Sequence, residues 1–97
     1  NEVVPTNGVY ATTIMLDGAI RPAVTNIGVR PTFGSDGERV IEAHLLDYDG
    51  DLYGKTLRLA FVQKLRDEQA FSTSGALQQQ IFADCERARA LFDSISL

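Results

Sequence analysis

Two side chains capable of acid–base chemistry, Glu42 and His44, lie two residues apart near the middle of the chain. Their segment, residues 39–48, predicts a strand, whose period of two places both side chains on one face. There the carboxylate could accept a proton from a substrate hydroxyl, and the imidazole could act as a base near neutral pH. The same pattern fits a solvated strand face, and a lone strand histidine more commonly makes only local hydrogen bonds. The pattern alone leaves both interpretations open.

A second candidate group, Arg66 and Phe71, stands where the strand-forming part of the chain gives way to a helical part. Loops at such junctions often contact ligands. A guanidinium can bind an anion or lie flat on an aromatic ring, and a phenyl ring can cover one. The alternative is a charged connector in which Phe71 only packs against the start of the helix.

The composition excludes several other classes of protein and site. With one cysteine and one histidine, the 97 residues hold neither an internal disulfide nor a Cys/His zinc site. A net charge of -4 argues against sequence-independent binding to nucleic acid or to an anionic membrane. No apolar run reaches the roughly 20 residues that span a bilayer, and no secretory leader is visible. We therefore expect a cytoplasmic protein without nucleic-acid or membrane partners.

Two smaller patterns are interpreted as structural. Asp47, Asp49 and Asp51 alternate as calcium ligands can, but the segment lacks the length and the closing glutamate of an EF-hand loop, so a hydrophilic turn is expected. Cys85 lies on an apolar helix stripe, which predicts a buried and inert thiol.

The elements that must position the candidate residues begin with strands. Strands are predicted at residues 9–16, 19–29, 39–48 and 55–65. Asp17-Gly18 is a strong signal for a tight hairpin between the first two strands. Pro22 restricts the start of the second strand to an edge or a bulge.

The last quarter of the chain changes to helical periodicity. Thr73 or Ser74 is expected to cap a helix of about five turns. Its apolar stripe consists of Leu77, Ile81, Cys85, Ala88, Phe92 and Ile95. Strands followed by one helix predict a mainly β domain, either a small barrel or a curled sheet with the helix packed against it.

Several short motifs follow one another in a distinctive order over nearly the whole chain. They are Asn7-Gly8-Val9-Tyr10-Ala11, residues 26–33 (NIGVRPTF), residues 42–48 (EAHLLDY), residues 51–55 (DLYGK), residues 65–71 (LRDEQAF), and Gln80, Ile81 and Asp84 on the helix. In this order and spacing they resemble the riboflavin kinase module of the bacterial bifunctional riboflavin kinase/FAD synthetases. The resemblance implies an antiparallel Greek-key β-barrel of six strands with one C-terminal helix.

The resemblance also implies an activity, the transfer of the ATP γ-phosphoryl group to the 5′-hydroxyl of riboflavin to give FMN. It implies that Glu42 is the catalytic base, since a primary alcohol attacking a phosphate must lose its proton. The remaining implied roles are nucleotide binding for Leu45, Asp47 and Tyr53, and flavin binding for Arg66 and Phe71. A non-catalytic flavin- or nucleotide-binding barrel and a purely structural domain remain the alternatives.

One departure from the family pattern concerns magnesium. The family's Mg²⁺ ligands belong to a glycine-rich nucleotide flap that is expected to precede Asn7, and Thr6 and Asn7 correspond to the spacer after it. No metal role is therefore transferred to these two residues. We expect residues 1–97 to be a riboflavin kinase domain that lacks the flap and a first strand, since four strands rarely close a barrel. We also expect an N-terminal adenylyltransferase domain in the parent chain, and little turnover by residues 1–97 alone.

Overall fold

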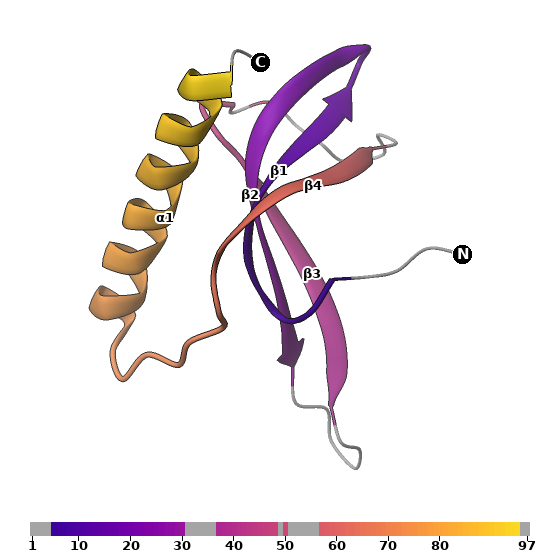
Figure 1. Cartoon of the computed structure of the whole chain (residues 1–97). Helices are drawn as coiled ribbons and strands as arrows, with labels where there is room; N and C mark the ends of the chain where they lie inside the picture. Colours follow the sequence, from indigo (N-terminus) through magenta and orange to yellow (C-terminus); the bar gives the residue numbers. More distant parts are fainter. Residues whose placement is uncertain (1–4, 31–36, 49, 51–56, 96–97) are drawn as a thin grey trace.

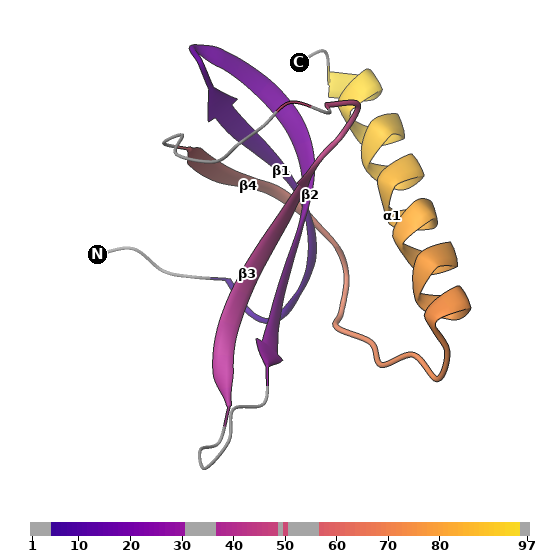
Figure 2. The same ribbon diagram turned by 180° about the vertical axis from the view of Figure 1, so that it is seen from behind.

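A computed structural model describes residues 5–30, 37–48, 50 and 57–95 of the chain. Its elements are β1 (Gly8–Leu16), β2 (Ala19–Arg30), β3 (Glu38–Leu45), β4 (Arg58–Arg66) and α1 (Ser74–Ile95). The four strands form one antiparallel sheet in the order β3-β2-β1-β4. The sheet is strongly twisted, and α1 lies against one of its faces (Figures 1 and 2). The prediction of a mainly β domain with one C-terminal helix is confirmed, with four strands among the described residues.

The hairpin between β1 and β2 forms as the sequence predicts. Leu16 pairs with Ala19, and the two residues between them, Asp17 and Gly18, both have positive φ angles, 52° and 78°. This backbone matches the right-handed twist of the two strands. Pro22 follows in β2, in the part of the strand that pairs with β1 before the β3 ladder starts at Ala23. The predicted edge position of Pro22 is thus confirmed.

The two later strands are shorter than predicted. β3 ends at Leu45 instead of residue 48, because the chain turns at Asp47, whose φ of 53° is incompatible with a strand. The N–H of Leu46 donates to the carbonyl of Pro22 at 3.0 Å and anchors this turn. β4 begins at Arg58, and residues 55 and 56 lie outside the described part of the chain.

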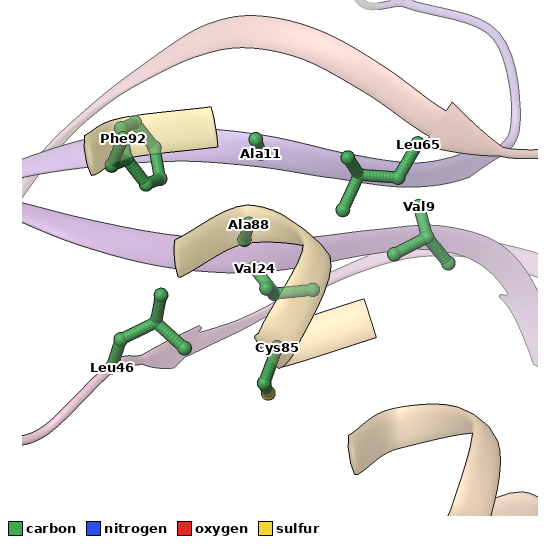
Figure 3. Packing of buried hydrophobic residues seen from close by; sticks show 8 residues of the cluster. All are labelled: Val9, Ala11, Val24, Leu46, Leu65, Cys85, Ala88 and Phe92. Atoms are coloured by element: carbon green, nitrogen blue, oxygen red, sulfur yellow. The ribbon is translucent and has the colours of Figure 1, made fainter. Parts of the chain in front are cut away.

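The sheet carries apolar side chains on both of its faces. On the side of α1, one cluster fills the space between helix and sheet (Figure 3). It consists of Val9, Ala11, Val24, Leu46, Leu65, Cys85, Ala88 and Phe92. On the other face a second cluster contains Ile14, Leu16, Ala23 and Leu45, with Tyr48 and Leu59 packed against it. The face of the sheet on which a side chain lies therefore decides which cluster it joins.

The helix stripe is buried only in part. Cys85, Ala88 and Phe92 are buried as predicted, but Leu77, Ile81 and Ile95 are between 41% and 47% exposed. The prediction was wrong for these three because the packed contact with the sheet is made by the part of the helix from Cys85 to Phe92, and Leu77, Ile81 and Ile95 lie before or after it. Near the N-terminal half, Leu77 and Ile81 instead line a cavity.

The start of α1 is capped by Thr73, as predicted. Its Oγ1 accepts a hydrogen bond from the N–H of Ala76 at 3.0 Å. We expect Thr73→Ala to lower the free energy of unfolding by about 1 kcal/mol, because the Ala76 N–H loses its partner. Urea unfolding followed by circular dichroism measures this change, with the exposed Ser72→Ala as control. A loss of the same size in both variants would contradict the assignment of the cap.

Candidate functional site

A cavity of about 490 Å³ lies between the helix-side face of the sheet, the β4–α1 connector and the first half of α1. The sheet contributes Val9, Val24, Asn26, Glu42, Ala43, His44 and Arg66, the connector Glu68, Gln69 and Phe71, and the helix Leu77, Ile81, Asp84 and Cys85. Apolar walls with a few converging polar groups are typical of a small-molecule site.

Glu42 and His44 reach this cavity because of the register between β2 and β3. Glu42 pairs with Asn26 and His44 pairs with Val24, so all four share one face of the sheet. Val24 belongs to the cluster beneath α1, which identifies that face as the helix side. The predicted common face of Glu42 and His44 is confirmed, and both line the cavity.

Arg66 reaches the cavity from the end of β4 and is held there by Asp84 of α1. Its Nε donates to Asp84 Oδ1 at 3.0 Å and to Oδ2 at 3.1 Å, and its Nη2 donates to Oδ2 at 2.9 Å. The Asp84 side chain is only 6% exposed, and its Oδ1 also accepts from Nε2 of Gln80 at 3.0 Å. This two-pronged pairing fixes the plane of the guanidinium as well as its position.

The β4–α1 connector supplies the aromatic wall. The Cζ atom of Arg66 lies 5.8 Å from the centre of the Phe71 ring, and Nη1 of Arg66 donates to the carbonyl of Asp67 at 3.1 Å. The structure therefore brings together three of the predicted site residues, Glu42, Arg66 and Phe71. Asp67 itself accepts a hydrogen bond from Lys64, and this lowers the pKa of Asp67. Both side chains are too exposed for the ion pair to contribute much to the stability of the fold.

The Glu68 side chain of the connector reaches β2. Its carboxylate, the flexible end of that side chain, lies over Gly28 in space that a Cβ would enter. Gly28 lies inside β2, paired with Val40. A glycine within a strand often marks such a close approach.

Of the three predicted nucleotide-binding residues, the two that the structure describes, Leu45 and Asp47, do not line this cavity. Leu45 is buried in the cluster on the opposite face of the sheet. Asp47 forms an ion pair with Arg89 of α1, at 2.9 Å between Oδ1 and Nη2. Tyr53 lies outside the described residues. Their nucleotide-binding role stays a prediction.

Sequence reasoning missed the role of Asp84, although a signal for it was present. Asp84 is three residues after Ile81 and four before Ala88, so it falls on the apolar stripe of α1. A carboxylate on the buried face of a helix requires a cationic or hydrogen-bonding partner. Arg66, at the junction before the helix, was the nearest candidate already singled out for the site.

Cys85 is buried and also borders the cavity. Burial raises the pKa of its thiol, with Arg89 opposing and nearby carboxylates adding to the effect. A raised folded-state pKa contributes stability below the unfolded-state pKa, and this stability is lost as the pH rises through the folded-state value. The position of Cys85 supports the prediction of an inert thiol.

We expect the alkylation rate of Cys85 by iodoacetamide to rise with pH, with a midpoint above that of the urea-unfolded chain, whose thiol has a pKa of about 8.5. The measurement is the alkylation rate of native and unfolded protein between pH 7 and 10 by mass spectrometry. Equal midpoints, or a lower one in the native protein, would contradict the effect of burial.

Neither a metal site nor a membrane span is found in the described part of the chain. No group of three or more His, Cys, Asp or Glu side chains there could hold a metal ion. No helix there combines the length and the apolar character needed to cross a bilayer.

The family described as "Flavokinase: Riboflavin kinase" matches residues 1–92. The chain belongs to the riboflavin kinase family, and the resemblance found in its motifs is confirmed. A structure of a macrolide-efflux protein from Streptococcus pneumoniae has a TM-score of 0.80 and 28% identity to this chain, covering 90% of it and 28% of that protein.

Three curated relatives illustrate the similarity in sequence. The bifunctional riboflavin kinase/FMN adenylyltransferase of Pseudomonas fluorescens is 51% identical over 88 residues, which cover 91% of this chain and 28% of that protein. The enzyme of the same name from Escherichia coli K12 is 39% identical and matches 94% of this chain and 29% of its own length. The RNA-binding riboflavin kinase RibR of Bacillus subtilis is 33% identical, with 94% of this chain and 40% of RibR matched. The chain thus spans well under half the length of each relative.

Proposed function

We propose that this chain is the riboflavin kinase domain of a bifunctional enzyme and transfers the ATP γ-phosphoryl group to the 5′-hydroxyl of riboflavin, giving FMN. Membership of the riboflavin kinase family and the two bifunctional relatives support this assignment. The structural observation that carries it is one cavity lined by the carboxylate of Glu42 together with Arg66 and Phe71.

The residues that line the cavity have different proposed roles, which follow from the chemistry of their side chains. The isoalloxazine ring of riboflavin is planar and aromatic, and Phe71 with the guanidinium of Arg66 offers two flat groups to contact it. Val9, Val24 and Ile81 provide apolar surface nearby. Glu42 comes from β3, on another wall, and accepts the proton of the 5′-hydroxyl as the new P–O bond forms. Phosphoryl transfer depends mainly on positioning and charge stabilisation, which this arrangement supplies for the acceptor.

Nucleotide binding is assigned to Leu45, Asp47 and Tyr53, in keeping with the family resemblance. The described residues near the N-terminus do not fit a magnesium ion. Thr6 Oγ1 accepts from Lys64 Nζ at 3.4 Å, and Asn7 Oδ1 accepts from Arg39 Nε at 3.0 Å. Both oxygens face cationic side chains, so neither offers a site for a second cation. The proposal assigns Mg²⁺ to the nucleotide flap of the parent protein and derives no step through it.

The proposal extends to the setting of the domain. Residues 1–97 form the kinase domain, and an adenylyltransferase domain in the same parent chain consumes the FMN that the kinase produces. Both reactions use ATP, and the lone thiol of Cys85 suits the reducing cytoplasm. The charge of the chain argues against a nucleic-acid partner, although one relative, RibR, is named as RNA-binding.

A riboflavin titration, followed by quenching of flavin fluorescence with and without Mg-ADP, tests the binding part of the proposal. Incubation of the complete protein with riboflavin and Mg-ATP, followed by chromatography, tests the chemistry. Saturable quenching together with FMN formation is the expected result. Binding without FMN formation would favour a non-catalytic flavin-binding module instead, and neither binding nor turnover by the complete protein would overturn the proposal.

A further inference from the structure

The carboxylate of Asp84 is the most deeply buried charged group of the cavity, and the mechanism above gives it no role. Its side chain is 6% exposed, whereas that of Arg66 is 18% exposed. Arg66 donates hydrogen bonds to the Asp84 carboxylate, and so does Gln80, which lies one turn earlier on α1. Burying a carboxylate costs free energy unless it is paired and hydrogen-bonded, and here it is both.

The pairing geometry determines how Arg66 meets a ligand. Nε and Nη2 are both engaged by Asp84, and Nη1 donates to the carbonyl of Asp67. Because all three nitrogens of the guanidinium donate hydrogen bonds, the orientation of its plane is fixed. The orientation of that plane relative to the Phe71 ring, 5.8 Å away, is thus set by α1 and not by the flexible arginine side chain.

We propose that Asp84 is a positioning residue for flavin binding: through Arg66 it fixes a flat guanidinium surface that the isoalloxazine ring contacts. This inference rests on the proposed function, because it takes riboflavin as the ligand. A guanidinium held in place before the ligand arrives loses little further freedom on binding, which strengthens affinity without any contact between Asp84 and the flavin.

Asp84→Asn and Asp84→Glu in the complete protein test this role. Asp84→Asn removes the charge, and Asp84→Glu keeps the charge but moves the carboxylate by one methylene group. We expect each to raise the Kd for riboflavin by about 10-fold, with a parallel rise in KM and a change in kcat of less than about threefold. If Asp84→Asn does not fold, as judged by circular dichroism, Asp84→Glu decides the outcome, because it leaves no buried cation unpaired.

Two further variants separate positioning from simple stabilisation. Arg87 donates to the carbonyl of Leu65, the residue before Arg66, and does not line the cavity, so Arg87→Met breaks a neighbouring link between α1 and β4. It should leave riboflavin binding unchanged. In an Arg66→Met background, Asp84→Asn should have no further effect on the Kd, because Asp84 acts through Arg66.

The outcomes are distinguishable from a failure of the proposed function. If the unsubstituted protein does not bind riboflavin, the proposed function is overturned, and this inference with it. If it binds riboflavin and the folded Asp84 variants bind equally well, this inference alone is overturned. A loss of affinity in Arg87→Met as large as that in Asp84→Asn would also overturn it, because it would indicate a general loosening of the helix.

Discussion

Replacing Glu42 with Gln in the complete protein should lower kcat for FMN formation by about 10²- to 10⁴-fold, the range that one general base contributes. The amide keeps the size of the side chain and its place on β3, opposite Asn26, but it cannot accept the proton of the attacking hydroxyl. The Kd for riboflavin should change by less than about threefold, because the expected contacts with the ring come from Arg66 and Phe71. Single-turnover FMN formation and fluorescence titration measure the two quantities separately.

Glu38 provides a matched control for this experiment. It lies on the same strand, four residues before Glu42 and therefore on the same face, and like Glu42 it is exposed, but it does not line the cavity. Glu38→Gln makes the same chemical change and should retain turnover. Equal kcat values for Glu42→Gln and the unsubstituted protein would remove Glu42 from the role of base. A large rise in the Kd with unchanged kcat would make it a binding residue instead.

Replacing Phe92 with Ala should lower the free energy of unfolding by about 3–5 kcal/mol, the cost of removing a buried aromatic side chain from a packed cluster. Phe92 is 6% exposed and packs between α1 and the sheet with Ala88 and Ala11 (Figure 3). Because small domains have only about 5–15 kcal/mol of net stability, this single change threatens the attachment of the helix. Urea unfolding at equilibrium gives the change directly.

Phe82 is the matched control, since it is the same residue type on the same helix but 67% exposed. Phe82→Ala should change stability by no more than about 0.5 kcal/mol. Phe92→Leu, which retains much of the apolar volume, should fall between the two. Equal losses for Phe82→Ala and Phe92→Ala would show that the cluster in Figure 3 does not hold α1 to the sheet.

The parts of the fold that the sequence predicted well are those determined by neighbouring residues. The Asp17-Gly18 turn needs only two residues with positive φ, and the Thr73 cap needs only an N–H three residues ahead. The end of β3 was missed because the turn at Asp47 depends on the hydrogen bond between Leu46 and Pro22, which are distant in sequence. The exposure of Leu77 and Ile81 was missed because periodicity identifies a helix face but not how far the packed contact extends along it.

In the candidate site, too, the features set by neighbouring residues were predicted and those set by residues distant in sequence were not. Strand alternation placed Glu42 and His44 on one face, and it also implies that Leu45, three residues from Glu42, lies on the other. One cavity is lined by β3, the β4–α1 connector and α1 together. The sequence does not predict this, because it depends on the pairing between strands and on the Arg66–Asp84 contact. Asp84 was recognised only as part of a family motif, because its partner lies 18 residues away.

The connector between β4 and α1 is anchored at both ends: Arg66 pairs with Asp84 where the connector begins, and Thr73 caps the helix where it ends. A short connector fixed at both ends has few alternative paths, so part of its conformational entropy is already lost in the unliganded protein. This wall of the cavity therefore exists before a ligand arrives. Association through it then resembles a lock-and-key encounter, with one kinetic phase whose rate rises in proportion to ligand concentration.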